Sequence, residues 1–193
     1  LPHESEGDKV SCRTRRSLGP VQPEAELDRL LARCAWAERV GEGTGILVSV
    51  SLQRLWLIAA GAPVWTADCS TAEAGVGFLE GSGMTPSGWH QIAEKFGEGE
   101  PWGRIFRSRA ATAKRWLPGD PAEEDLVLTR VLWLEGKEPG LNSGKDPQGR
   151  GVDSKARHIY IHGTNGEALI GAPASHGCVR LLNDDVIELL QRV

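Results

Sequence analysis

The spacing of hydrophobic residues changes near residue 45. Between Pro23 and Gly41 apolar residues recur every three or four positions, which predicts an amphipathic helix that ends at the glycine. From 46 to 50 apolar residues recur at every second position, as in a strand with one buried face. A second run at 54–60 and a third at 64–69 flank the turn residues Gly-Ala-Pro, so this part of the chain predicts a β-meander.

Further strands are predicted at three places beyond the meander. They are the segments 89–96, 126–134 and 157–163, the first of which follows a Thr-Pro-Ser-Gly turn at 85–88. The chain then closes with a short helix over 183–193, for which we expect Asn183 to be the N-cap. The sequence therefore predicts a mainly β fold, a sandwich or barrel with short helices and an N-terminal amphipathic helix.

Two segments do not fit this pattern. Residues 1–22 are charged and without a period, and we expect a flexible lead there. Residues 97–124 are charged and interrupted by glycine and proline, which indicates a long insertion with a short helical piece near 110–116. The predicted organisation is thus a lead plus helix at 1–44 and one domain at 45–193.

Composition excludes several classes of protein. The 193 residues are 40% hydrophobic and 25% charged, with a net charge of −4, so a nucleic-acid partner is not expected. No run of about 20 apolar residues predicts a transmembrane segment. The first ten residues lack the basic-then-apolar order of a secretory signal, which fits either a mature secreted form or a cytoplasmic protein.

The four cysteines, Cys12, Cys34, Cys69 and Cys178, form no Cys-x-x-Cys pair. A zinc ribbon or a thioredoxin-like site is therefore not expected. If Cys178 is a free thiol, at most one disulfide can form among the other three. Cys34 and Cys69 are typical of small buried apolar residues.

Candidate chemistry begins in the segment Arg157–Gly163. Alternation along a strand would place His158, Tyr160 and His162 on the face opposite the isoleucines. Three polar or ionisable side chains in one row indicate the wall of a cleft, although an exposed polar face has the same pattern.

A second group of reactive residues lies at 175–178, the tetrapeptide Ser-His-Gly-Cys. The Cys178 thiol needs a base to attack an amide at neutral pH, and His162 and His176 are both available. Gly177 allows a reacting carbonyl to approach the backbone. We expect the N–H groups of Gly177 and Cys178 to form an oxyanion hole, which is often worth about 3 kcal/mol in the transition state.

Two other interpretations of these residues remain open. His158, His162, His176 and Cys178 could bind zinc, but their spacing is not that of familiar zinc sites and no carboxylate accompanies them, so no metal is expected. Alternatively, Cys178 is a buried structural thiol among hydrogen-bonded histidines.

The stretch from His162 to Asn183 resembles the signature of the L,D-transpeptidase (YkuD-type) catalytic domain. The family pattern has His-Gly, then Ser-His-Gly-Cys, a small apolar residue, Arg and, a few positions on, Asn. The matching residues here are His162, Gly163, Ser175, His176, Gly177, Cys178, Val179, Arg180 and Asn183. The strand from residue 45 and the turn at 85–88 also resemble the family, so the likeness spans about three-quarters of the chain.

This resemblance implies an enzyme that acts on peptidoglycan stem peptides without a cofactor. Cys178 would attack the carbonyl of the third stem residue and form a thioester, with His162 as base and the Gly163 carbonyl orienting its ring. His176 would tune the thiol or shape the pocket. Substrate-binding residues would be Arg180, Tyr160, Ser175 and Asn183. The resemblance also implies inhibition by carbapenem-type compounds and a periplasmic or cell-wall location.

Arg180 has a second interpretation, a structural ion pair with Asp184 or Asp185. The acidic residues at 98, 100 and 123–125 are interpreted as a solvated loop face. Relative to the family, the loop between His162 and Ser175 is short, and the insertion at 97–124 matches nothing.

Three other functions stay open from the residues alone. The same thioester could be hydrolysed, which would make an L,D-carboxypeptidase. A wall-binding module could keep the fold without catalysis, although it would not need a thiol beside a base. A sortase-like transpeptidase also uses Cys, His and Arg, but it would leave His176 unexplained.

Overall fold

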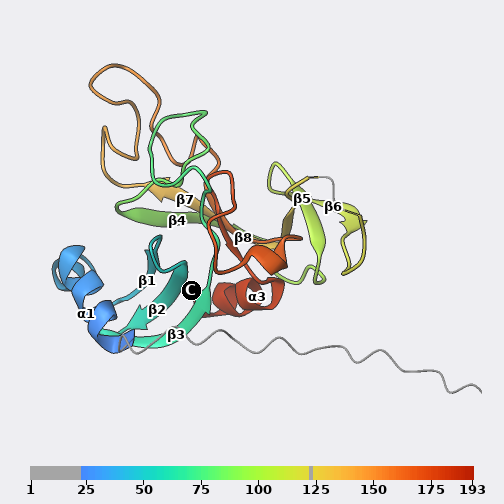
Figure 1. The fold of residues 1–193 in the computed structure, drawn as a ribbon, viewed down its shortest axis with the longest axis horizontal. Helices are drawn as coiled ribbons and strands as arrows, with labels where there is room; N and C mark the ends of the chain where they lie inside the picture. Colours follow the sequence, from blue (N-terminus) through green and yellow to red (C-terminus); the bar gives the residue numbers. More distant parts are fainter. Residues whose placement is uncertain (1–22, 122–123) are drawn as a thin grey trace, which may run out of the picture.

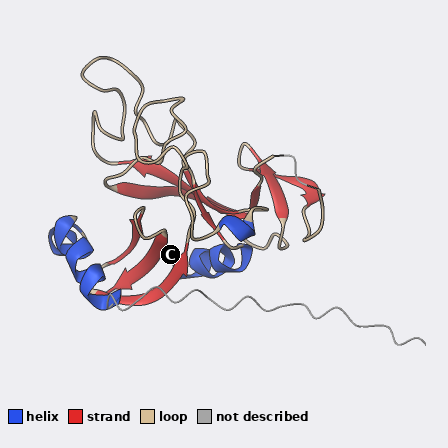
Figure 2. Cartoon of the chain, viewed as in Figure 1, coloured by secondary structure: helices blue, strands red, loops and turns tan. Residues whose placement is uncertain are grey.

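The structure, a computed structural model, describes residues 23–121 and 124–193 (Figures 1 and 2). The predicted flexible lead at 1–22 lies outside the described residues. Two helices, α1 (Pro23–Arg33) and α2 (Trp36–Arg39), stand where one amphipathic helix was predicted. The interruption is at Ala35, whose φ of 53° is left-handed and cannot continue a right-handed helix.

The predicted β-meander is present as a three-stranded antiparallel sheet. Its strands are β1 (Thr44–Ser49), β2 (Arg54–Ala59) and β3 (Ala62–Asp68). The turn between β2 and β3 uses Ala60 and Gly61, both at positive φ. The helices pack on this sheet, because Leu27 and Trp36 are buried against Trp56.

A second sheet has six strands and carries the candidate site. They are β4 (His90–Phe96), β5 (Arg104–Arg107), β6 (Ala110–Arg115), β7 (Val127–Gly136), β8 (Tyr160–Gly163) and β9 (Val179–Leu181). The order is β6-β5-β7-β8-β9, and β4 also pairs with β7. Strand β7 is central, with β8 along one edge and β4 and β5 along the other. Only β8 and β9 run parallel among these pairs.

The predicted helical piece at 110–116 is wrong. Residues 110–115 form β6, which pairs with β5 in an antiparallel hairpin. Ala110–Arg115 has a good local helix propensity, but pairing with β5 overrides this weak preference. Figure 1 shows the hairpin projecting on the side of the molecule away from α1.

One core joins the two sheets and the C-terminal helix α3 (Asn183–Arg192). Leu55 of β2, Ile161 of β8 and Leu189 of α3 are all buried in it. A backbone bridge between Ser70 and Arg180 also connects the end of the meander to β9. The mainly β prediction is confirmed, and the two sheets remain open rather than closing into a barrel. A short 3-10 turn, η1 (Glu167–Leu169), lies in the connection between β8 and β9.

The predicted N-cap of α3 needs a correction. Leu182 occupies the N-cap position, and no side chain caps the helix there. Asn183 is instead the first helical residue, and its side chain is buried below β8, as described below. None of the helices in the described part of the chain is long and apolar enough to span a membrane.

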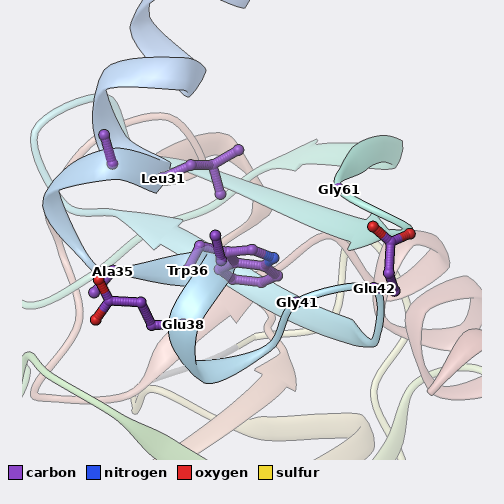
Figure 3. A pocket seen from close by; sticks show the side chains of 9 residues that line it. Leu31, Ala35, Trp36, Glu38, Gly41, Glu42 and Gly61 are labelled. Carbon is purple, nitrogen blue, oxygen red and sulfur yellow. The ribbon is translucent and has the colours of Figure 1, made fainter.

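A surface hollow of about 520 Å³ lies at the N-terminal helices. Figure 3 shows Trp36 at its centre, between Glu38 and Glu42. The Trp36 indole nitrogen is buried without a hydrogen-bond partner among the described residues. The lining contains none of the residues predicted to carry the chemistry, which lie on the second sheet.

Candidate active site

The parallel pairing of β8 and β9 gathers four predicted site residues on one face of the sheet. Ile161 pairs with Val179 and His162 pairs with Arg180. Side chains alternate along a strand, and paired residues point to the same face. Ile161 and Val179 face the core that contains α3, so Tyr160, Cys178, His162 and Arg180 share the opposite face.

His162 is held in a state that can accept a proton. Its side chain is 2% exposed, and Nδ1 lies 2.7 Å from the carbonyl oxygen of Gly163. A carbonyl oxygen only accepts, so Nδ1 carries the proton and Nε2 of the neutral ring is free of one. Burial lowers the pKa of His162 below its usual value, which keeps the ring neutral at pH 7.

Gly163 is required by its surroundings. A Cβ at this position would lie 2.4 Å from Oδ1 of Asn183 and 3.0 Å from the carbonyl oxygen of Leu128. Because backbone and a buried amide occupy that space, any larger residue would displace the carbonyl that holds the His162 ring.

The Cys178 thiol is bound by backbone groups of the preceding turn and β8. Its Sγ accepts the N–H of Tyr160 at 3.3 Å and lies 3.5 Å from the carbonyl oxygen of His158, toward which the S–H donates. Burial raises the pKa of the Cys178 thiol to about 11. At neutral pH Cys178 is therefore a thiol, and attack by its sulfur on a carbonyl would require a base.

Arg157 is a cation near this thiol that the sequence analysis missed. It acts, with other groups, to lower the pKa of Cys178, against the larger effect of burial. Its guanidinium donates to the carbonyl oxygens of Gly77, Phe78 and Met84. The arginine therefore holds the 77–84 loop next to the Cys178 thiol.

The loop before Cys178 is fixed by two hydroxyl groups. Ser175 Oγ donates to the carbonyl oxygen of Cys178 at 2.6 Å and accepts the Gly177 N–H at 3.3 Å. Thr85 Oγ1 donates to the carbonyl oxygen of Gly177 at 3.0 Å and accepts the N–H of Ala72 at 2.9 Å. The Thr-Pro-Ser-Gly turn thus supports the loop that presents Cys178, a role that its sequence did not reveal.

Gly177 itself needs the freedom of glycine. Its φ is +130°, and a Cβ would lie 3.3 Å from Ile159 and 3.4 Å from the Met84 carbonyl. The backbone turn that presents Cys178 therefore depends on this residue.

Arg180 is buried in an ion pair that the sequence did not predict. It is 3% exposed, and its Nη1 lies 3.0 Å from Asp125 Oδ1, while Nη2 donates to Ser70 Oγ at 3.2 Å. Its structural partner is therefore Asp125, and the predicted pairing with Asp184 or Asp185 is wrong.

Asp125 is also more than part of a solvated loop face. It accepts a hydrogen bond from Thr164 Oγ1 at 3.3 Å, and its Oδ2 lies 3.7 Å from Nδ1 of His176. The His176 side chain is 83% exposed. Among weaker effects, Asp125 raises the pKa values of both His162 and Cys178, while Arg180 lowers them. This carboxylate thus links the exposed histidine to the buried arginine.

Asn183 lies beneath the His162–Gly163 backbone. It is fully buried, its Oδ1 accepts the Thr129 hydroxyl, and its Nδ2 donates to the carbonyl oxygen of Thr164 at 2.8 Å and to Glu167 at 2.7 Å. All of these bonds are internal. They place Asn183 in the framework that holds Gly163, as the hydroxyl bonds place Ser175 in the loop that presents Cys178.

Tyr160 and Trp133 form an aromatic wall beside the thiol. They pair across β8 and β7, with their rings edge to face at 6.3 Å, and Cys178 packs against the Tyr160 cluster. His158 was expected on the same strand face, but its φ of 57° places it in the turn before β8, with an exposed side chain. It still lies 6.2 Å from the Trp133 ring centre.

No group of three or more His, Cys, Asp or Glu residues that could hold a metal ion occurs in the ranges 23–121 and 124–193. The four residues considered for zinc are separated by their environments, because His162 is buried and His158 and His176 are exposed. Cys34, Cys69 and Cys178 are free thiols, and Cys12 lies outside the described residues.

Comparison with known proteins agrees with this geometry. A sequence model of the YkuD family, the L,D-transpeptidase catalytic domain, matches residues 43–193. The protein named Probable L,D-transpeptidase ErfK/SrfK of Salmonella typhimurium is 30% identical over 150 residues, which cover 77% of this chain and 41% of that protein. Its namesake in Escherichia coli is 28% identical over 151 residues, with the same shares covered. The chain therefore belongs to the YkuD family.

The chain spans about two-fifths of the length of these relatives. Among solved structures, the L,D-transpeptidase from Xylanimonas cellulosilytica (residues 123–326) is similar with a TM-score of 0.43 and 18% identity, covering 78% of this chain and 55% of that one.

Proposed function

We propose that this chain is a cysteine-dependent peptidoglycan L,D-transpeptidase. The observation that carries the proposal is the position of a buried, neutral His162 on the same sheet face as the Cys178 thiol, with its Nδ1 proton held by the Gly163 carbonyl. Membership of the YkuD family supports the same function.

In the first half-reaction His162 Nε2 takes the Cys178 proton as Sγ attacks the carbonyl carbon of the third residue of a tetrapeptide stem. The tetrahedral oxyanion is received by the N–H groups of Gly177 and Cys178. The bond between Gly177 N–H and Ser175 Oγ is long, at 3.3 Å, so this donor can turn to a stronger acceptor. The C–N bond then breaks, the imidazolium returns the proton to the leaving amine, and D-alanine departs from the thioester.

In the second half-reaction an amine of another stem attacks the thioester. His162 takes a proton from that amine and returns it to Sγ as the C–S bond breaks, which leaves a 3→3 cross-link and the free thiol. Water in place of the amine would give a tripeptide, the product of an L,D-carboxypeptidase. We place this activity in the periplasm or cell wall, where peptidoglycan lies.

Asp125 and Arg180 have a supporting role in this proposal. Arg180 is buried beside His162, and its partly exposed partner Asp125 reaches toward His176 at the surface. We assign His176 to the rim of the site and the buried Arg180, Ser175 and Asn183 to its framework, with Tyr160 as the wall that meets substrate.

The test is a product analysis with a disaccharide-tetrapeptide donor, with and without an acceptor stem. We expect D-alanine release and a cross-linked dimer from the wild type, and neither from Cys178→Ala. The Cys34→Ala variant, which removes a thiol of the N-terminal helices, serves as the control and should match the wild type. D-alanine release that survives Cys178→Ala would refute the proposed nucleophile.

A further inference from the structure

The tip of the β5–β6 hairpin carries an arginine that reaches the wall of the site. Its two-residue turn, Ser108–Arg109, has φ values of 47° and 71°. Both residues are left-handed, as a type I′ turn requires, although neither is glycine. Such a conformation costs of order 1 kcal/mol per residue and persists only where the surroundings hold it.

Contacts at the far end of the side chain hold Arg109 in place. Its guanidinium carbon lies 4.0 Å from the centre of the Trp133 ring, and Nη1 donates to the Tyr160 hydroxyl at 3.0 Å. Tyr160 is the residue whose backbone N–H contacts Cys178 Sγ, and its side chain packs against the same cluster as the thiol. The guanidinium is therefore separated from the nucleophile by one aromatic side chain.

Arg109 has no carboxylate partner among the described residues, and its guanidinium is largely free of other hydrogen bonds. Arg157 also lacks a carboxylate partner, but four hydrogen bonds to the 77–84 loop occupy its guanidinium. Arg107 on the same hairpin pairs with Glu124, and Lys155, which also lies over Trp133, is 3.6 Å from Glu94. Arg180 pairs with Asp125. A guanidinium has five N–H donors, and only one of those of Arg109 has a partner in the part of the chain that the structure describes.

The chemistry of the proposed reaction supplies an anion close to this position. A donor that releases its last residue as a free amino acid carries a carboxylate three bonds beyond the attacked carbonyl carbon. From standard bond lengths, that carboxylate carbon lies within about 4 Å of the attacked carbon. A planar guanidinium binds a carboxylate through two parallel hydrogen bonds, and the Trp133 face restricts Arg109 to one plane.

We propose that Arg109 is a specificity-determining residue that binds the terminal carboxylate of the residue leaving the donor stem. This inference rests on the proposed function, because it takes the leaving residue from that reaction. It makes the enzyme selective for donors with a free C-terminal carboxylate over donors in which this group is amidated or extended.

The experiment compares a tetrapeptide donor with its C-terminal carboxamide. Binding is measured by calorimetry in the Cys178→Ala background, where no turnover occurs, and KM and kcat are measured in the active enzyme. We expect the parent protein to bind the free acid about tenfold more tightly than the amide, a preference typical of one charge-assisted contact. In Arg109→Gln this preference should disappear, because the affinity for the free acid falls to that for the amide. Arg109→Lys should keep part of the preference.

Arg107→Gln is the matched control, because it removes a cation from the same hairpin without touching Trp133 or Tyr160. It should keep the full preference, and equal melting temperatures should show that all variants are folded. Equal affinity of the parent for acid and amide, or a preference that survives Arg109→Gln, would overturn the inference. Loss of D-alanine release and of Cys178 acylation by the wild type, with the binding preference intact, would instead refute the proposed function alone.

Discussion

At the scale of single residues, the candidate site combines a neutral imidazole, the proposed base, with a protonated thiol, the proposed nucleophile. Burial lowers the pKa of His162 and raises that of Cys178 to about 11, so both groups are uncharged at pH 7. Burying a thiolate–imidazolium ion pair would cost desolvation free energy that two neutral partners do not incur. In the proposed reaction we therefore expect proton transfer to His162 to accompany the attack instead of preceding it.

Removal of this base should abolish most turnover while leaving the fold intact. His162→Gln should lower kcat for D-alanine release by about 10²- to 10⁴-fold, the usual contribution of a positioned general base. His158→Gln, a change at an exposed histidine in the adjacent turn, should have little effect. A His162→Gln enzyme within threefold of the wild type would show that another group is the base.

The protonated state of the nucleophile can be read from its alkylation. In a Cys12→Ala/Cys34→Ala background, the rate at which iodoacetamide modifies Cys178 should follow the thiolate fraction. With a thiol pKa of about 11, the rate should rise about tenfold per pH unit from pH 7 to 10 without a plateau. A plateau beginning near pH 6 would indicate a preformed thiolate–imidazolium pair.

Gly163 is the residue at which packing and catalysis meet. Gly163→Ala would place a methyl group 2.4 Å from Asn183 Oδ1, and we expect a loss of about 1–3 kcal/mol in the free energy of unfolding. Gly166→Ala is the control, since its nearest contact would be an ordinary 3.5 Å. Urea denaturation measures both variants, and equal stabilities would contradict the packing described here.

The sequence predicted the site residues that are close together in the chain, but not those whose contacts join distant parts of it. Cys178, His162 and Gly163 are close in a short parallel strand pair, so a compact motif identifies them. Asp125 contacts Arg180 and Arg109 contacts Tyr160, each more than fifty residues away, and nothing in their local sequence distinguishes the two residues from solvated charges.

At the scale of elements, the spacing of apolar residues predicted the meander and three of the six strands of the second sheet, β4, β7 and β8. Period-two alternation predicted the strand at 46–50, and a continuous apolar run predicted the one at 54–60. Both faces of β2 are buried, with Leu55 in the core that contains α3 and Trp56 and Ile58 against the N-terminal helices. The spacing failed for β6, where small and charged residues favour a helix locally and only pairing with β5 makes a strand. It also overextended β8 by including His158, whose left-handed φ the alternation cannot reveal.

The turn at 85–88 supports the loop that presents Cys178 through a single hydroxyl group. Thr85→Val, which has nearly the same shape, would leave the Gly177 carbonyl and the Ala72 N–H without their partner. We expect a loss of about 1–3 kcal/mol in stability and a lower rate of Cys178 acylation. Ser87→Ala, an exposed change in the same turn, is the control. An unchanged acylation rate in Thr85→Val would show that this contact does not position the loop.

At the scale of the whole molecule, one core connects the meander, the second sheet and α3, so the site is fastened to both halves of the fold. One buried histidine, His162, and one half-buried histidine, His90, make that stability depend on pH. Burial lowers the pKa of His90 as well as that of His162. As the pH falls through about 6.5, the unfolded chain takes up these protons before the native state does, and the native state loses stability.

We therefore expect the free energy of unfolding to be smaller at pH 5.5 than at pH 7.5. The range from pH 5.5 to 7.5 lies above the usual pKa values of carboxyl groups, so the histidines dominate the change in stability within it. The double variant His90→Gln/His162→Gln should show a clearly smaller decrease between the two pH values, as measured by urea denaturation. A decrease as large as that of the wild type would place the effect in other groups.

The central claim is that Cys178 forms the acyl-enzyme, and intact-protein mass spectrometry tests it most directly. The protein is incubated with a carbapenem and, separately, with a disaccharide-tetrapeptide, and the adduct is located by peptide mapping. We predict a stable carbapenem adduct on Cys178 and release of D-alanine from the tetrapeptide. Folded protein with a reduced Cys178 that acquires no adduct and releases no D-alanine would contradict the claim and favour a wall-binding module.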